Sequence, residues 1–184
     1  MYRKAYLQIW WGLLFLLLSF HVQGIDLLPD LVGYFLLFLG LRTLAAQHPQ
    51  FWIVIYFAAA SVVYRGVLKI LLSGSDEGNP LTSYAMTLFL ENIQGVFHFL
   101  TLYALYQAIR SVAQNQGCFA FSQKVEGAQR ALLSVFLAMA FASPFLPHFE
   151  AGVAALLFVL QLIFFFICLY SLILVRLAAR QLAH

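Results

Sequence analysis

Charged side chains are scarce in this sequence. Asp, Glu, Lys and Arg make up 9% of the 184 residues, and 64% of the residues are apolar. Soluble domains carry about a quarter charged and about half apolar residues, so the composition excludes an ordinary soluble domain. The basic residues stand singly between apolar runs, with a formal net charge of only +3, whereas nucleic-acid binding needs a clustered basic face. We therefore expect a membrane protein whose partner is the lipid bilayer and not nucleic acid.

Cysteines and catalytic motifs are equally sparse. The two cysteines, Cys118 and Cys168, form no metal-ligand motif. The chain also lacks the H-E-x-x-H, G-x-S-x-G and P-loop patterns of hydrolases and nucleotide-binding enzymes. We predict no catalytic residue, no metal and no cofactor, and hence no enzyme. Four loop residues could still meet at one surface: His21, Asp26, Asp30 and His148. Their spacing gives no support to a metal site.

Long apolar runs dominate the chain. A membrane-spanning helix needs about 20 apolar residues, and polar, Gly- and Pro-rich breaks divide the sequence into runs of roughly this length. The pattern predicts an all-α bundle of about six transmembrane helices in a single domain over residues 1–184. The approximate ranges are 5–22, 28–46, 51–73, 81–112, 129–147 and 151–178. Residues 117–130, GCFAFSQKVEGAQR, are expected either as a loop or as a short amphipathic segment on the lipid surface.

Basic residues set the expected orientation, because cytoplasmic loops collect Lys and Arg. With an even number of spans and both termini in the cytoplasm, only Arg65 and Lys69 lie away from the cytoplasmic side. The residues placed at that side are Arg3, Lys4, Arg42, Arg110, Lys124, Arg130, Arg176 and Arg180. The opposite orientation would put nearly all of them outside. We therefore predict a multi-pass protein of the cell membrane with cytoplasmic N and C termini.

Two aspartates mark the start of the second run, in the stretch GIDLLPDLVGYFLLFLG. Asp26 suits an N-cap position, where its carboxylate accepts backbone amide hydrogens, and Asp30 then lies near the positive end of the helix dipole. We expect them at the outer mouth of the bundle, either as a plain helix start or also facing a polar path. Gly33 and Gly40 are one heptad apart, which favours close packing of a neighbouring helix.

Polar residues of the fourth run recur at steps of four, three, four and three, which places them on one helix face. They are Thr87, Glu91, Gln94, His98 and Thr101, and we call them the polar stripe. Such a stripe must be buried against other helices or line water, because lipid-facing Glu, Gln and His side chains are too costly.

Residues of other runs are expected to meet the polar stripe. Counted from the loop between the third and fourth runs, Arg65 and Glu91 lie roughly 12 and 15 Å deep at 1.5 Å per residue, and we predict an ion pair between them. Tyr56, Tyr64 and Ser61 make the third run polar enough to pack in the bundle centre. Residue Gln161 of the sixth run could join the stripe.

Two interpretations of the polar stripe stay open. In the first, it binds or conducts a small solute or ion, lined by Glu91, Gln94 and His98. Glu91 and His98 then exchange protons if burial shifts them, and Arg65 serves as counter-ion. In the second, it is a packing seam in a non-catalytic accessory or regulatory subunit of a membrane complex. Interhelical polar contacts stabilise a bundle by about 1 kcal/mol or less each, which offsets little of the cost of burying the stripe. We therefore favour the first interpretation. Six short spans leave room for a homo-oligomer or a membrane partner protein in either case.

The segment GIDLLPDLVGYFLLFLGLRTL resembles a group of small uncharacterised integral membrane proteins from Firmicutes. Their early loop reads I-x-L-L-P-D-x-x-G-Y before an apolar run that ends in G-L. The matching residues here are Leu28, Pro29, Asp30, Gly33, Tyr34, Gly40 and Leu41. The resemblance implies a bacterial plasma membrane and no particular activity.

Overall fold

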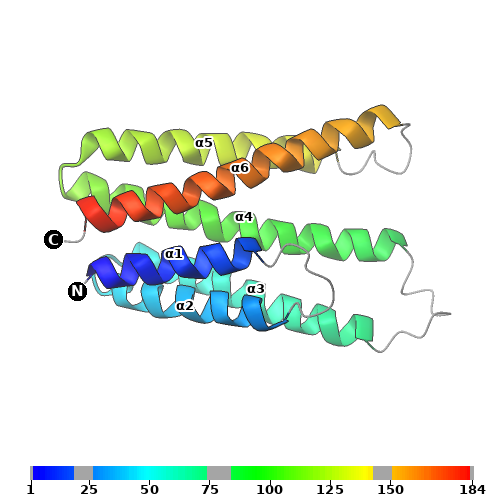
Figure 1. Ribbon diagram of the computed structural model, residues 1–184, viewed down its shortest axis with the longest axis horizontal. Helices are drawn as coiled ribbons and strands as arrows, with labels where there is room; N and C mark the ends of the chain where they lie inside the picture. Colours follow the sequence, from blue (N-terminus) through cyan, green and yellow to red (C-terminus); the bar gives the residue numbers. More distant parts are fainter. Residues whose placement is uncertain (1, 19–26, 74–83, 143–150, 183–184) are drawn as a thin grey trace.

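A computed structural model of the protein describes residues 2–18, 27–73, 84–142 and 151–182. Over these residues the chain is all-α and forms six helices (Figure 1). They are α1 (Tyr2–Leu18), α2 (Leu27–Ala45), α3 (Gln50–Ser73), α4 (Tyr84–Asn115), α5 (Phe119–Ala142) and α6 (Ala151–Gln181). Each predicted apolar run overlaps one helix, so the all-α class and the six helices are confirmed.

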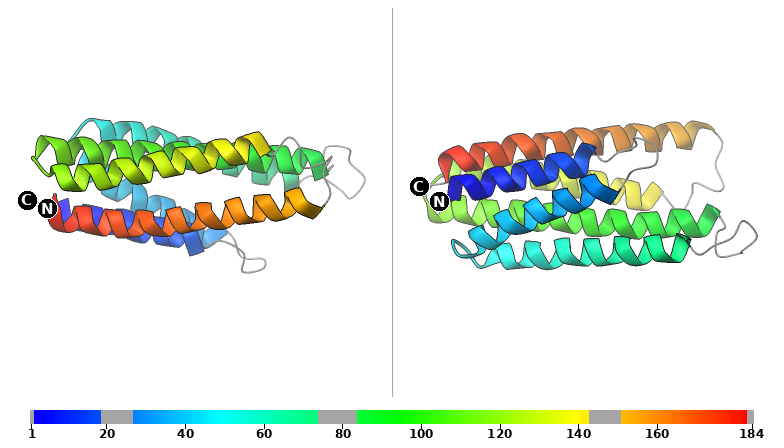
Figure 2. Two further views of the ribbon diagram at one scale, coloured as in Figure 1. Left: turned by 90° about the horizontal axis from the view of Figure 1, so that it is seen from above. Right: turned by 60° about the horizontal axis from the view of Figure 1, so that its bottom comes forward.

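The helices run alternately in opposite directions along one long axis (Figures 1 and 2). Each helix packs against the next one in the chain, and α6 packs against α1. The helices therefore form a closed ring in which the first and the last helix are neighbours. As a result, the start of α1 and the end of α6 lie at the same end of the bundle (Figure 1).

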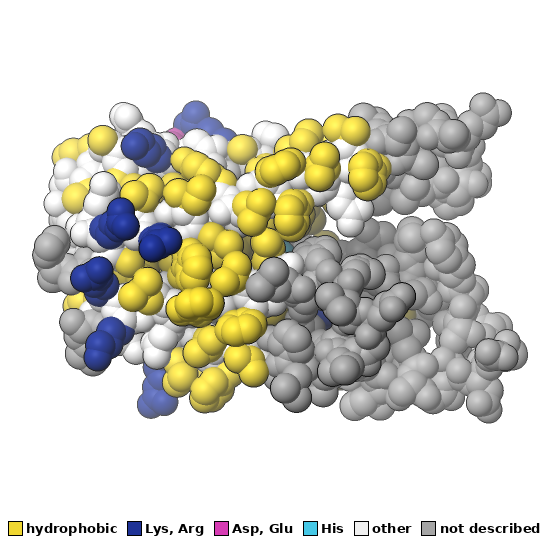
Figure 3. Space-filling model, in the orientation of Figure 1, with side chains coloured by type: hydrophobic (Ala, Val, Ile, Leu, Met, Phe, Trp, Pro, Cys, Tyr) yellow, Lys and Arg dark blue, Asp and Glu magenta, His cyan; other side chains and the backbone are white. Residues whose placement is uncertain are grey.

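Basic side chains gather at this end of the bundle (Figure 3). We call it the basic end. Its residues are Arg3, Lys4, Arg42, Arg110, Lys124, Arg176 and Arg180, all near the helix ends that meet there. Arg130 lies farther along, near the middle of α5, and Arg65 lies within α3, away from the basic end. The predicted grouping is therefore met for all of these basic residues except Arg130.

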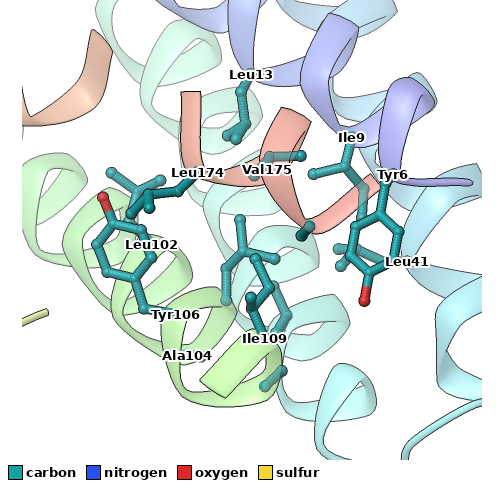
Figure 4. Close-up of a cluster of buried hydrophobic side chains, with 14 of the residues drawn as sticks. Tyr6, Ile9, Leu13, Leu41, Leu102, Ala104, Tyr106, Ile109, Leu174 and Val175 are labelled. Carbon is teal, nitrogen blue, oxygen red and sulfur yellow. The ribbon is translucent and has the colours of Figure 1, made fainter. Parts of the chain in front are cut away.

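Among the side chains that the structure describes, the buried core lies toward the basic end. Side chains from α1, α2, α4 and α6 converge there (Figure 4). Those that are less than 2% exposed include Tyr6, Ile9, Leu41, Leu102, Tyr106, Ile109 and Leu174. This packing fills the centre of the ring between the basic end and the middle of the bundle.

Glycines bring α1 and α2 into backbone contact. A Cβ at Gly40 would lie 2.6 Å from the carbonyl oxygen of Ala5, and one at Gly12 would lie 2.7 Å from that of Gly33. Real Cβ atoms do not approach backbone this closely, so only glycine fits. The predicted close packing at Gly33 and Gly40 is confirmed, and the neighbour is α1.

Helix α4 ends in a turn that requires glycine. Gly117 has a φ of 74°, a left-handed conformation that side chains with a Cβ disfavour. The Gly117 amide donates to the carbonyl of Gln114, and the Cys118 amide donates to that of Ala113. This pair of hydrogen bonds is the Schellman pattern that closes a helix C-terminus, and α5 begins at the next residue.

The start of α5 corrects the sequence-based boundary. The helix begins at Phe119, whereas the apolar run was expected to begin near residue 129. Residues Phe121, Val125, Ala128 and Leu132 are buried at helical spacing, and Lys124 between them is exposed. The segment is therefore the amphipathic first half of α5. Gln123, Lys124 and Arg130 are exposed, whereas the polar residues Ser122 and Gln129 are buried with the apolar ones.

Two helices meet the length and hydropathy of a membrane span over the described residues. These are Gln50–Leu68 in α3 and Phe158–Gln181 in α6, each with 28% of its window buried within the protein. The six-span prediction is thus met for two of the six helices. Helix α1 covers only 17 described residues, and the polar stripe and the polar residues at the start of α5 lower the hydropathy of α4 and α5.

Candidate binding site along α4

The polar stripe lies within α4, where residues 87–101 form uninterrupted helix. Gln94 and His98 are half-buried and Thr101 is 4% exposed, whereas Gly95 and Val96 are exposed. The described part of the stripe therefore faces neighbouring helices. The side chains of Thr87 and Glu91 lie outside the described residues.

Helix α3 covers this part of α4. The Tyr64 hydroxyl donates a hydrogen bond of 2.9 Å to the carbonyl oxygen of Leu90. The ring of Tyr64 lies with its centroid 5.4 Å from that of Phe97. Ser61, about one turn from Tyr64 on α3, is fully buried. The two helices thus meet along the stretch of α4 that carries Gln94.

Four polar atoms of α3 and α4 are buried without a hydrogen-bond partner among the described residues. Oε1 of Gln50 and Nε of Arg110 lie near the ends of their helices, and Oε1 of Gln94 and Oγ of Ser61 lie along the stretch where the two helices meet. A buried polar group that stays unpaired costs about 1–3 kcal/mol. Thr101 differs, because its hydroxyl donates to the Phe97 carbonyl at 2.8 Å, one turn earlier in the same helix. The stripe therefore has a satisfied end at Thr101 and an unused acceptor at Gln94.

Arg65 and His98 are half-buried, and neither is without an interaction partner. The hydrogen bond from Tyr64 to Leu90 places the next residues along, 65 and 91, at the same level of α3 and α4. Because the Glu91 side chain lies outside the described residues, the Arg65–Glu91 ion pair stays a prediction.

The outer aspartates also stay a prediction. Helix α2 begins at Leu27, directly after Asp26, but Asp26 itself lies outside the described residues. Asp30 is in the first turn of α2, and its side chain lies outside them too. His21 and His148 are likewise outside. The described part of the chain contains no group of three or more His, Cys, Asp or Glu residues that could hold a metal ion.

Packed side chains separate the polar stripe from the basic end. Beyond Thr101, the α4 residues Leu102, Leu105 and Ile109 are at most 1% exposed. The Tyr106 hydroxyl lies 2.5 Å from Oγ of Ser171 and links α4 to α6. A solute at Gln94 would therefore be closed off from the basic end in this conformation.

The expectations for α3 and α6 were met only in part. Tyr64 contacts α4 and Ser61 is fully buried, as a central position for the third run requires. Tyr56, however, is 69% exposed, and Gln161 is exposed on α6 and does not join the stripe. Both side chains lie on the outer face of their helix, which apolar composition alone does not reveal.

Comparisons of the chain with known protein families, with curated proteins and with solved structures give no match.

Proposed function

We propose that this chain is a membrane protein of six spans that binds a small solute or ion between α3 and α4. Its outward-facing side chains support a membrane location. Phe35 of α2, Val63 of α3, Phe141 of α5 and Phe158 of α6 are each more than 60% exposed. Soluble monomers rarely expose apolar patches larger than a few hundred Å². An apolar surface next to the basic end (Figure 3) suits a bilayer whose cytoplasmic face attracts Lys and Arg.

The buried, unpartnered oxygens of Gln94 and Ser61 carry the binding proposal. Polar atoms in a membrane helix must be satisfied, and the described residues offer no hydrogen-bond partner to these two oxygens. A bound cation, water or the polar group of a small solute would satisfy them. His98 and Arg65 lie on the same two helices and, with Glu91, would supply charge to such a ligand.

Binding rather than open conduction agrees with the packing toward the basic end. Leu102, Leu105 and Ile109 fill the route along α4 in the direction of the cytoplasm. Movement of a solute from the stripe to that side would require α4 to shift relative to α6, with loss of the Tyr106–Ser171 contact. We therefore propose a site that is occluded on the basic side and that opens only when these helices move.

A second candidate is a non-catalytic accessory or regulatory subunit of a membrane complex. The hydrogen bond from Tyr64 to Leu90 and the intrahelical bond of Thr101 favour it, because both belong to a packing seam that needs no ligand. On this alternative, the exposed apolar faces would pack against a partner protein or a second copy of the chain.

Flux measurements on the full chain in liposomes test the leading proposal. Entrapped indicators report proton, Na⁺ and K⁺ movement for wild type, Glu91→Gln and Gln94→Leu. Gln107→Leu is the control, because Gln107 is exposed on the same helix and outside the polar stripe. We expect flux in wild type and in the control, and a fall to the rate of empty liposomes in both stripe variants.

Thermal unfolding in detergent detects an ion that binds to the protein but does not cross the membrane. A bound ion stabilises the folded state in proportion to the logarithm of its concentration once binding is saturated. Na⁺ or K⁺ should raise the melting temperature of wild type and Gln107→Leu, compared with choline at equal ionic strength, and not that of Glu91→Gln. Neither flux nor stabilisation in wild type would reject the ion-binding proposal and favour the accessory subunit.

A further inference from the structure

A groove runs along the outside of the bundle between α1 and α6. It encloses about 650 Å³. Its wall toward the middle of the bundle is apolar and includes Leu169, Leu172 and Ile173 of α6 together with Trp10 of α1. Its end toward the basic end carries Arg176 and Arg180. The groove is thus apolar over most of its length and cationic at one end.

The two arginines have no acidic residue on the helices that form the groove. The sequences of α1 and α6 contain neither Asp nor Glu. The guanidinium carbon of Arg176 lies 5.8 Å from the centre of the Trp10 ring. Arg3 and Lys4, both exposed, add two positive charges at the start of α1. The described carboxylate nearest in sequence, Glu126 of α5, is already paired with Arg110 and Arg130.

The length of the groove matches one leaflet of a bilayer. From Leu169 to Arg180 the helix rises about 16 Å, at 1.5 Å per residue. Half of a hydrocarbon core about 30 Å thick is about 15 Å. An acyl chain in the groove would therefore end near the bilayer centre while its headgroup lies at the arginines. A free anion would fill only the cationic end and leave the apolar wall uncovered.

We infer that the groove between α1 and α6 binds an anionic phospholipid of the cytoplasmic leaflet. Its phosphate lies between Arg176 and Arg180, and one acyl chain lies against Trp10, Leu169 and Ile173. A planar guanidinium binds phosphate oxygens through paired N–H donors, and the negative charge of the lipid replaces the carboxylates that α1 and α6 lack. The inference rests on the proposed membrane location, and it is independent of what the polar stripe binds.

Native mass spectrometry of the detergent-purified full chain tests the inference. The protein is exchanged into mixtures of phosphatidylglycerol and phosphatidylcholine, and the bound lipid is counted for wild type, Arg180→Gln and Arg42→Gln. The control is closely matched, because both arginines are exposed and lie in the last turn of their helices. Only Arg180 lines the groove. We expect wild type to prefer phosphatidylglycerol and Arg180→Gln to lose about fivefold of that preference, which is the effect of one basic residue at an anionic surface.

Two further measurements distinguish a bound lipid from a free anion held at the arginines. Ile173→Trp fills the exposed apolar part of the groove and should lower phosphatidylglycerol binding with both arginines intact. Glycerol phosphate, which has the headgroup without acyl chains, should not displace the lipid. Displacement by glycerol phosphate would overturn the inference, because the acyl chain would then contribute nothing to binding.

The arginine variants and the wild type provide the remaining outcomes. Equal losses in Arg180→Gln and Arg42→Gln would overturn the inference, because they would indicate general surface charge. No preference for phosphatidylglycerol in wild type would overturn it as well. Recovery of the protein without detergent, in the aqueous fraction, would instead contradict the membrane location itself.

Discussion

Gly40 and Gly66 are both helical glycines, and their surroundings differ sharply. A Cβ at Gly40 meets the Ala5 carbonyl oxygen at 2.6 Å, whereas nothing lies within 4 Å of one at Gly66. We expect Gly40→Ala to force α1 away from α2 and to lower the free energy of unfolding by about 1–3 kcal/mol, the usual cost of overpacking. Gly66→Ala should raise it by up to about 1 kcal/mol, because alanine is the better helix former.

Thermal unfolding of the two alanine variants in the same detergent measures this difference. A change of the same sign and size in both would show that α1 and α2 do not touch at Gly40. A fall confined to Gly40→Ala would establish the backbone contact, since both substitutions add the same methyl group to a helix.

At the residue scale, the sequence best predicts the surroundings of a residue when they depend on the pattern within a single helix. The heptad spacing of Gly33 and Gly40 indicated close packing without reference to a partner. The partner glycine, Gly12, could not be foreseen, because nothing in the first run shows which of its faces meets α2. The sequence could not predict that Oε1 of Gln94 and Oγ of Ser61 have no hydrogen-bond partner among the described residues, because this depends on the side chains of the neighbouring helices.

At the scale of elements, Glu126 joins α4 to the first half of α5. Its carboxylate lies 2.9 Å from the guanidinium of Arg110, and it also pairs with Arg130 one turn along α5. The Arg110 and Glu126 side chains are 33% and 25% exposed, so solvent screens the pair. We expect Glu126→Gln to destabilise the protein by about 1 kcal/mol or less.

Arg130→Gln is the matched control for Glu126→Gln, because it leaves the link to Arg110 in place. Its melting temperature should fall less than that of Glu126→Gln, and the gap between the two should narrow at high salt. A gap that persists unchanged at about 1 M salt would argue against an electrostatic link between α4 and α5.

Helix boundaries were predictable where Gly and Pro break an apolar run, as at the start of α3 and at the end of α2. The start of α5 was not, because hydropathy averaged over a window cannot separate a loop from an amphipathic helix. Burial at positions 121, 125, 128 and 132 shows the helical period that the polar residues between them obscured. The periodic signal was present in the sequence, but the polar composition of the segment outweighed it.

At the scale of the whole molecule, the two native cysteines report the orientation. Cys118 is partly exposed in the turn between α4 and α5, at the basic end, and Cys168 is buried in α6. In the proposed topology the basic end lies in the cytoplasm, so a membrane-impermeant maleimide should label Cys118 in inside-out vesicles and leave it unlabelled in right-side-out vesicles. Cys118→Ser should abolish the signal, because Cys168 is shielded by the protein. Labelling from the outside of right-side-out vesicles would reverse the proposed topology.

The sequence predicts the order of the helices and the packing of successive helices, but it does not predict the contact between α1 and α6. Short breaks between runs predict that successive helices are antiparallel and adjacent. Contact between α1 and α6 joins residues far apart in the chain, and no local pattern encodes it. The groove with Arg176 and Arg180 exists only because of this contact.

Ring closure gives the protein an order of assembly during synthesis. Helix α1 can pack against α2 as soon as both have left the ribosome, because the glycines that bring them together lie within the first 40 residues. Its other neighbour, α6, is made after the other five described helices. In the proposed membrane location, one side of α1, including Trp10, has only lipid or the insertion machinery to contact until α6 has been made. We therefore expect a chain that stops before α6 to leave the bundle open beside α1 and to be degraded by membrane proteases faster than the chain that includes α6.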